Sequence, residues 1–393
     1  MPDRILNARL APFTSTIFTE MSALAVRTGA VNLGQGFPDT DGPTEVVEAA
    51  VAALRSGLNQ YAPGPGVPEL RVAVADHQRR FYGIDLDPDS QVVITFGATE
   101  GLASSILGLC EPGDEVIIIE PWYDSYGACI ALAGARRRVV TLRPPDFVLD
   151  PDDLARAVTR ATRMVLINSP HNPTGRVFSQ EELEGVARVC VDHDLLAVTD
   201  EVYEHLVFEG RHLPLATLPG MAERTLTVSS HGKTFSFTGW KVGWVTGTAP
   251  LVAAAHIAKQ YLTFHGGTPL QYAAAVALRL PDAFYAGIAA DLAAKRDRVC
   301  AGLAQVGFSV FPPLGTFFVV TDAAPLGAED GLEFCLSLPE RVGVVAVPVS
   351  VFYDDPAPAR TLVRFAFPKR TEVLDEGLAR LKGLARGAET AAG

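Results

Sequence analysis

From about residue 90 onward, the sequence alternates short β-branched runs with longer amphipathic stretches. The strand-like runs lie at 91–96, 115–119, 164–168, 195–199 and 225–228. Helical stretches are predicted between them, from residue 97 to about 109 and from the Ser179–Glu182 capping box toward His193. Strands that alternate with helices in this way form a parallel sheet covered by helices on both faces. The predicted fold class is therefore a doubly wound α/β domain.

The pattern changes after about residue 270. Long helices are predicted at 271–280 and 281–306, and strands at 316–321 and 360–367. A chain of 393 residues also exceeds the usual size of a single core. We therefore expect a second, smaller α+β domain in the C-terminal part.

The charge of the chain restricts its partners. A formal net charge of −12 argues against nucleic acid and against anionic membrane surfaces, because both attract a basic excess. The first residues contain no apolar signal core, and no apolar run reaches the roughly 18 residues of a membrane span. The expectation is a soluble cytoplasmic protein.

The cysteines and histidines show no metal-binding pattern along the chain. Five cysteines are widely spaced without a Cys-x-x-Cys pair, which indicates buried thiols in a reducing compartment: Cys110, Cys129, Cys190, Cys300 and Cys335. The eight histidines form no His-x-x-x-His or His-x-x-Glu-His spacing. We therefore predict no catalytic metal.

Two of the six lysines, Lys233 and Lys241, lie in one glycine-punctuated stretch at 229–244 that is predicted to be a loop entering a strand. A lysine among small and aromatic neighbours loses hydration, which favours the neutral amine needed for a Schiff base. The second cation would lower the proton affinity of Lys233 and could anchor a phosphate. These are the requirements of a pyridoxal phosphate site. The alternative is a solvated loop with incidental lysines.

Polar residues at strand ends carry functional weight in an open α/β sheet, because ligands bind at the carboxyl ends of the strands. Gly97, Ala98 and Thr99 lie between a strand and a helix start, where free amides bind anions, although an ordinary tight turn also explains them. Asp200 ends an apolar strand, and its carboxylate can keep a pyridine nitrogen protonated. Its alternative role is a helix N-cap.

Three side chains are suited to the ring of such a cofactor. Tyr203 and Asn172 can donate to the ring oxygen, and Tyr123 can stack on the ring face. Hydrogen bonding to backbone, a turn at Asn-Pro and core packing are the respective alternatives. Arg364 lies within a strand-like apolar run, where it is costly unless it meets a carboxylate, either of a substrate or of a structural ion pair.

Taken together, these residues resemble the class I aminotransferases of fold type I, closest to the kynurenine, glutamine and methionine aminotransferase branch and to actinobacterial N-succinyldiaminopimelate aminotransferases. The resemblance spans nearly the whole chain. It rests on an ordered set of motifs at 31–39, 59–61, 97–99, 121–124, 172–175, 199–203 and 229–244, followed by Arg364. It implies a mostly parallel seven-stranded sheet in a large domain at 46–275, a small domain at 276–393, and residues 1–45 as an arm that also contributes to the small domain.

The resemblance also implies roles for individual residues. Lys233 would be the Schiff-base lysine and proton shuttle, Asp200 would bind the pyridine nitrogen, and Asn172 and Tyr203 would bind the ring oxygen. Tyr123 would stack on the ring, and Arg364 would bind the substrate α-carboxylate. The phosphate would be held at the Gly97 turn by Ala98, Thr99, Ser230 and Lys241, and Tyr61 would reach across from the partner subunit of a homodimer. Phe18, Gly36, Asn172, Phe264 and His265 would line the substrate pocket.

One position departs from the family pattern. His231 stands two residues before the lysine, where the family usually has serine, alanine or glycine. A titratable ring near the phosphate could alter the pH dependence of the site.

The predicted activity is a ping-pong amino transfer between an amino acid and a 2-oxo acid with pyridoxal 5′-phosphate. A carbon–sulfur β-lyase uses the same residues and stays open, as does a cofactor-bound regulatory protein without turnover. The aromatic neighbours favour a large apolar or aromatic substrate side chain, whereas an acidic one such as N-succinyl-diaminopimelate remains an alternative.

Overall fold

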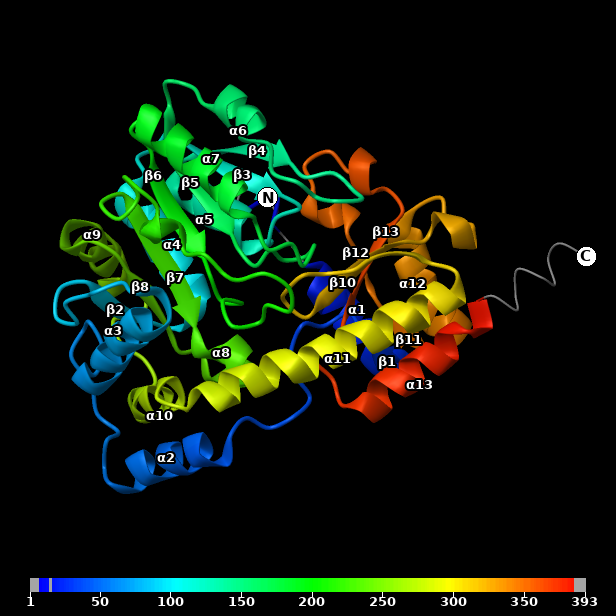
Figure 1. Ribbon diagram of the computed structural model, residues 1–393, viewed down its shortest axis with the longest axis horizontal. Coiled ribbons are helices and arrows are strands. Elements are labelled where there is room, and N and C mark those ends of the chain that lie inside the picture. Colours follow the sequence, from blue (N-terminus) through cyan, green and yellow to red (C-terminus); the bar gives the residue numbers. More distant parts are fainter. Residues whose placement is uncertain (1–6, 14–15, 385–393) are drawn as a thin grey trace, which may run out of the picture.

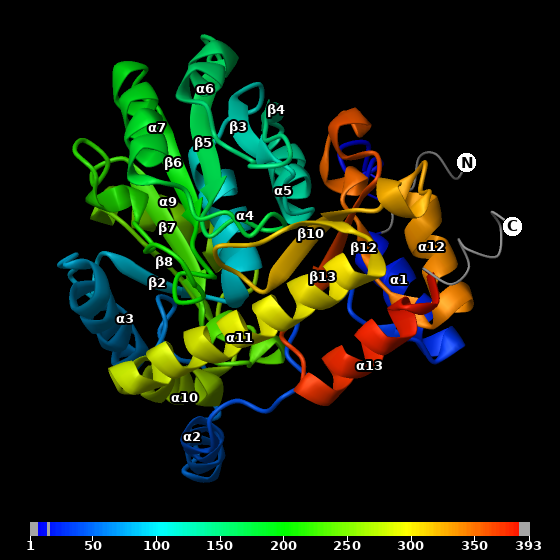
Figure 2. The same ribbon diagram turned by 45° about the vertical axis from the view of Figure 1, so that its right-hand side comes forward.

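The computed structural model describes residues 7–13 and 16–384. A helix-covered sheet forms one side of the molecule and a smaller sheet with its own helices forms the other (Figure 1). The long helix α11 (Asp282–Val306) runs across both parts (Figure 2).

The large sheet has seven strands and is mostly parallel, as predicted. Only β8 runs against its neighbours, because it pairs antiparallel with both β2 and β7. The strands are rich in buried apolar residues because helices cover both faces of the sheet. In spatial order they are β2 (Val92–Thr95), β8 (Gly243–Thr246), β7 (Thr225–Ser230), β6 (Leu196–Asp200), β5 (Thr162–Asn168), β3 (Glu115–Glu120) and β4 (Arg136–Thr141).

The helices of this part follow the predicted alternation. The capping box is formed, with the Ser179 side chain accepting from the Glu182 amide and the Glu182 carboxylate accepting from the Ser179 amide. The helices are α2 (Thr44–Arg55), α3 (Pro68–Tyr82), α4 (Gly97–Leu109), α5 (Ser125–Ala133), α6 (Pro151–Ala157), α7 (Gln180–Asp192), α8 (His231–Thr234), α9 (Ala249–Gln260) and α10 (Thr268–Leu278).

The smaller part contains a four-stranded antiparallel sheet in the order β12 (Val347–Pro348), β13 (Leu362–Ala366), β10 (Phe318–Asp322) and β9 (Ser309–Phe311). A parallel pair joins β1 (Val31–Asn32) to β11 (Val344–Val345), so residues near the N-terminus pack with the C-terminal part. Helices α1 (Ile17–Thr28), α12 (Gly331–Val342) and α13 (Thr371–Leu381) complete it. The domain boundaries after residues 45 and 275 stay a prediction.

Short 3₁₀ turns connect several elements: η2 (Leu215–Thr217), η3 (Thr238–Trp240), η4 (Ala324–Leu326), η5 (Ser350–Phe352) and η6 (Ala357–Ala359). All five cysteines are unpaired, and every one except the half-buried Cys300 is buried. Within the described ranges, no single helix has the length and apolarity to cross a membrane; only α10 and α11, bent by 90° at their junction, pass that test together.

The segment around Lys233 differs from its prediction. Lys233 lies on α8, a single helical turn that follows β7 directly, and not in a loop. The chain can fold back this tightly because residue 232 is glycine: a Cβ there would lie 3.1 Å from the Thr238 Cα. Residues 235–242 then lead into β8, as the second half of the prediction stated.

Candidate active site

A cavity of about 310 Å³ lies where the carboxyl ends of β5 and β6 and the end of β7 face the smaller part. It gathers most of the predicted site residues from distant parts of the chain. These are Phe18, Gly36, Gly97, Ala98, Thr99, Tyr123, Asn172, Asp200, Tyr203, Ser230, Lys233, Lys241 and Arg364.

One end of the cavity is built to receive an anion. Helix α4 begins there at Gly97, so its first amides and its dipole point at the ligand space. Gly97 has φ +72°, and a Cβ at this position would lie 3.1 Å from the Lys241 Nζ. Lys241 itself adopts a left-handed conformation with φ 54°. The glycine therefore allows the helix start and the ammonium to share one small space, which suits a phosphate group.

Lys233 lies half-buried at the floor of the cavity. Its Nζ lies 5.7 Å from the ring centroids of both Tyr203 and Phe317. Burial lowers the pKa of Lys233 to about 8; Asp200 opposes this shift, whereas Lys241 and Arg364 add to it. The loss of hydration and the influence of Lys241 agree with the sequence argument.

Asp200 is the last residue of β6 and is buried beside the same space. Its Oδ2 accepts a hydrogen bond of 2.7 Å from the Tyr126 hydroxyl, and its Oδ1 accepts one of 3.4 Å from the Val202 amide. Burial raises the pKa of Asp200, while the Tyr126 hydrogen bond and Lys233 act in the opposite direction. Turns follow Asp200 and no helix begins there, so the N-cap interpretation is wrong.

Asn172 and Tyr203 flank this floor. The backbone amide of Asn172 donates to Asn168 Oδ1 at 2.7 Å. This hydrogen bond fixes the position of Asn172 after the end of β5. The Tyr203 ring packs edge-on against Phe317 with centroids 5.3 Å apart. Burial raises the pKa of Tyr203, so its hydroxyl stays protonated as a donor. Both side chains therefore line the cavity with hydrogen-bonding groups.

Arg364 on β13 is 1% exposed and carries no counter-ion from the part of the chain that the structure describes. Its Nη1 donates to Asn172 Oδ1 at 3.1 Å and its Nη2 to the Gly34 carbonyl at 2.9 Å. The guanidinium lies 4.0 Å from the centroid of the Phe318 ring, with Phe18 and Phe352 beyond. Burial lowers its pKa to about 10. The structural ion pair is therefore not formed, and a carboxylate from outside would compensate the charge.

Three predicted residues lie outside this cavity. Tyr61 is 81% exposed, and it packs edge-on against Phe264 and His265 with ring centroids 5.4 and 6.4 Å away. Within one chain, Phe264 and His265 do not line the substrate space as expected. The role of Tyr61 in a partner subunit stays a prediction.

His231 also faces away from the ligand space. Its Nδ1 lies 3.1 Å from the Val242 carbonyl and its ring stacks on Phe237. Burial lowers the pKa of His231 to about 4, so the ring is neutral near pH 7. It does not supply the titrating group near neutral pH that the sequence suggested.

Sequence reasoning missed two supporting residues. Tyr126 holds Asp200, although no spacing rule connects positions 74 residues apart. Gln35 lines the cavity, and its side-chain amide donates to the Phe18 carbonyl at 2.9 Å and also contacts Ser22 Oγ. Gln35 thereby fixes the backbone of Phe18. Gln35 lies within the motif at 31–39, and Tyr126 follows the motif at 121–124. This position next to a family motif was the only sequence signal for a role of either residue in the site.

The comparisons with known proteins agree with this geometry. The model of the family "Aminotransferase class I and II" matches residues 28–381. The chain is 53% identical over 389 residues to the probable N-succinyldiaminopimelate aminotransferase of Mycobacterium tuberculosis, covering 96% of this chain and 98% of that one. It is 40% identical over 381 residues to the methionine aminotransferase of Escherichia coli, covering 97% and 98%. The solved N-succinyldiaminopimelate aminotransferase from M. tuberculosis superposes with a TM-score of 0.95 at 53% identity, covering 96% of this chain and 100% of that one.

Proposed function

This chain belongs to the class I and II aminotransferases, and we propose that it uses pyridoxal 5′-phosphate in the described cavity to move an amino group between an L-amino acid and a 2-oxo acid in ping-pong order. One observation carries the proposal. A half-buried lysine of lowered pKa, a buried carboxylate and a buried arginine that has no counter-ion among the described residues converge on one space. Each of these groups is costly without a ligand.

The residues present fit the cofactor. The start of α4, Ser230 and Lys241 would hold the phosphate. Asp200 would bind the pyridine nitrogen, Asn172 and Tyr203 the ring oxygen, and Tyr123 the ring face, as the family resemblance implies. When bound, pyridoxal phosphate supplies an electron sink for the negative charge that proton removal leaves on the substrate α-carbon.

The protein groups then have separate tasks. Arg364 presents its guanidinium fork to the substrate α-carboxylate and so fixes the orientation of the α-carbon. Lys233 takes the α-proton with its amine and later returns a proton, and a pKa near 8 suits both directions at neutral pH. The rings of Tyr203 and Phe317, each 5.7 Å from the amine, reduce its hydration.

We propose N-succinyl-diaminopimelate, with glutamate as the partner amino acid, as the first substrate to test, because a relative of that name shares 53% identity over nearly the full length. The aromatic rings of Phe18 and Phe318 at the cavity favour a large apolar side chain as the second candidate. Among the described residues, the lining of the cavity contains three cationic side chains, which are those of Lys233, Lys241 and Arg364.

We further propose a cytoplasmic homodimer. The exposed aromatic residues Tyr61, Tyr261 and Phe264 suit a protein interface, and Tyr61 would complete the site of the partner. The unpaired cysteines fit a reducing compartment.

The test is an absorbance titration of the purified holoenzyme with glutamine, methionine, kynurenine, phenylalanine, glutamate and N-succinyl-diaminopimelate. We expect the true amino donor to convert the visible cofactor band and release a 2-oxo acid. Lys233→Ala should lower turnover by more than about 10³-fold, whereas Lys382→Ala, at an exposed position, should leave it unchanged.

Other outcomes separate the alternatives. Pyruvate and ammonia formed from an S-substituted cysteine without an oxo acid would identify a β-lyase. A spectral change without any released oxo acid would identify a binding protein. If no band appears after pyridoxal phosphate is added, the cofactor assignment is wrong.

A further inference from the structure

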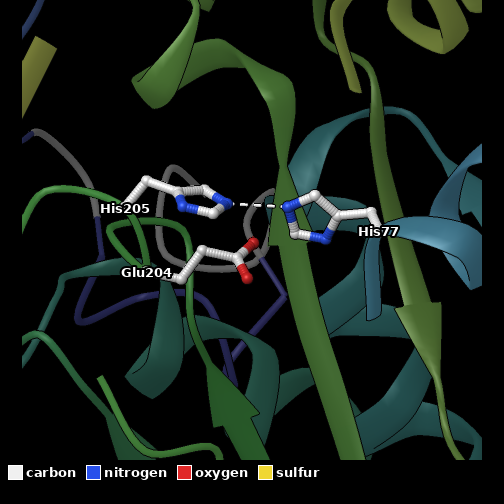
Figure 3. Close-up of side chains that lie close together, drawn as sticks. All are labelled: His77, Glu204 and His205. Atoms are coloured by element: carbon white, nitrogen blue, oxygen red, sulfur yellow. Dashed lines mark hydrogen bonds between the residues drawn. The ribbon is translucent and has the colours of Figure 1, made fainter. Parts of the chain in front are cut away.

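Three side chains of metal-binding type meet outside the cavity: His77 on α3, and Glu204 and His205 in the turn after β6 (Figure 3). Their ligand atoms all lie within 4.8 Å of one another, and the two histidine Nε2 atoms are 2.7 Å apart. None of the three lines the cavity of the active site. Because His77 and His205 are 128 positions apart, no motif search along the sequence could connect them.

The cluster is largely buried and incompletely bonded. His77 and Glu204 are 2% and 6% exposed, and His205 is half-buried. Glu204 Oε1 accepts a hydrogen bond of 2.7 Å from the Ser229 hydroxyl. Among the residues described, Glu204 Oε2 and His77 Nδ1 have no hydrogen-bond partner. Buried polar atoms of this kind are rare because each one costs desolvation energy. The buried Tyr82 hydroxyl faces this carboxylate and is the nearest donor to it, although it too lacks a hydrogen bond of ordinary geometry among the residues described. The carboxylate therefore still has room for a further ligand.

The neighbouring pair Glu201 and His212 is equally buried and forms a direct contact of 2.7 Å. His212 also acts on Glu204 from a distance and lowers the pKa of that carboxyl, but it is bonded to Glu201. The cluster itself gives Glu204 no counter-ion, because burial lowers the pKa of His77 to about 3 and that of His205 well below its usual value. Both rings are therefore neutral, which is the form of imidazole that binds metal ions.

We propose that His77, Glu204 and His205 bind one divalent transition-metal ion of the zinc class. Two imidazole nitrogens and one carboxylate oxygen are a ligand set that zinc uses in proteins, with a water molecule as the fourth ligand. With bonds of about 2.0–2.2 Å, tetrahedral ligand atoms lie roughly 3.4 Å apart. The two Nε2 atoms are now 2.7 Å apart, so binding requires them to move apart by less than about 1 Å. The Glu204 side chain must also rotate to bring its carboxylate closer to both rings.

Such an ion would have a structural role. It would tie α3 to the turn that begins after Asp200 and carries Tyr203. Loss of the ion should therefore lower thermal stability, while the groups around Lys233 keep their positions.

The experiment uses tag-free holoenzyme treated with a chelator and then titrated with zinc chloride by calorimetry. We expect one zinc ion per chain and a Tm at least about 3 °C higher with zinc than without it. Cobalt(II) should give the visible absorption of a tetrahedral site. Glu204→Gln and His205→Asn should abolish both signals, whereas His193→Asn, which changes an exposed histidine, should retain them.

The wild-type titration decides the matter even where a variant fails to fold. Absence of stoichiometric zinc binding to the wild-type protein would overturn the proposal and leave the cluster as a hydrogen-bonded contact. Zinc binding that His205→Asn retains in full would overturn it too, because the ion would then lie elsewhere.

Discussion

Asp200 and Glu204 lie at the two ends of one short turn after β6, and both carboxylates are buried, yet their surroundings differ. Asp200 accepts from Tyr126 and Val202 and lines the cavity beside Lys233. Glu204 lies beside the neutral imidazoles of His77 and His205, outside the cavity lining. Burial raises the pKa of both, and that of Glu204 rises to about 7. The neighbours therefore distinguish the two carboxylates: hydrogen-bond donors and a lysine surround Asp200 at the cavity, whereas imidazole rings surround Glu204.

The lysines show the same contrast. The Nζ of Lys259 is buried by protein and donates to the carbonyls of Gly64 and Phe264 at 2.9 and 2.6 Å. Lys233 is half-buried, and its Nζ makes no hydrogen bond to any residue in the described ranges. A lysine whose ammonium is held by carbonyl acceptors stabilises the scaffold, whereas one without such acceptors is available for chemistry.

The strongest test of the comparison is Asp200→Asn. The amide has nearly the same shape but carries no charge, so the cavity loses the anion beside Lys233. We expect kcat to fall by about 10²–10³-fold. Steady-state assays and the absorbance of the bound cofactor measure the effect. Asp192→Asn, on the exposed end of α7, is the control, and an Asp200→Asn variant with normal kcat would contradict the assignment.

The second test concerns stability without the cofactor. The folded-state pKa of Lys233 is about 8 against 10.5 in the unfolded chain, so the unfolded chain binds more protons between these values. Stability of the wild type should therefore rise as the pH increases from 8 to 10.5, and the burial cost below pH 8 is at most about 3 kcal/mol.

Lys233→Met should remove this dependence and be more stable than wild-type apoenzyme below pH 8, by an amount that shrinks toward pH 10.5. Lys259→Met should instead destabilise the fold, because two carbonyls lose their donor. Urea unfolding at several pH values measures both. Equal pH dependence in the two variants would remove the distinction between these lysines.

The third test is Arg364→Lys. The charge remains, but an ammonium cannot offer two parallel donors to a carboxylate and also reach Asn172 and Gly34. We expect KM for the amino acid to rise by about 30- to 100-fold with a smaller change in kcat. Arg71→Lys is the matched control, because Arg71 is also buried but is paired with Asp89. A change in kcat alone would argue that Arg364 does not bind the substrate carboxylate.

The residue patterns predicted most strands of the large sheet and most residues that line the candidate site, but they did not predict β4, and the count of seven strands came from the family resemblance. Strand runs and the capping box are local signals, and the residues at strand ends follow from the geometry of parallel sheets. The short helix at Lys233 was not predictable from periodicity, because one turn is too short to show it. It is accompanied by the close approach of Gly232 to Thr238, a contact within the folded-back segment that periodicity does not register.

Long-range partners account for the rest. The environment of Arg364 depends on Phe18 and Phe318, which lie far from it in the sequence and leave it without a described carboxylate partner. The His77 and Glu204 cluster likewise joins α3 to a turn more than a hundred residues later. Spacing rules read only neighbours along the chain, so they cannot register contacts of this kind.

Tyr126 is the residue of this kind that is easiest to test, and its effect should be the smallest. In the wild type, the Tyr126 hydroxyl donates to Asp200 Oδ2 and so lowers the pKa of that carboxyl. Tyr126→Phe removes this donor, and the pKa of Asp200 should therefore rise further. The acidic limb of the pH–kcat profile should move to higher pH, and kcat should fall by about 10-fold. Tyr353→Phe removes a comparable buried hydrogen bond to the Leu142 carbonyl, 2.9 Å long and remote from the cavity lining, and should leave the profile in place. If both variants lose activity alike with unshifted profiles, Tyr126 only packs, and the difference between Asp200 and Glu204 does not depend on this donor.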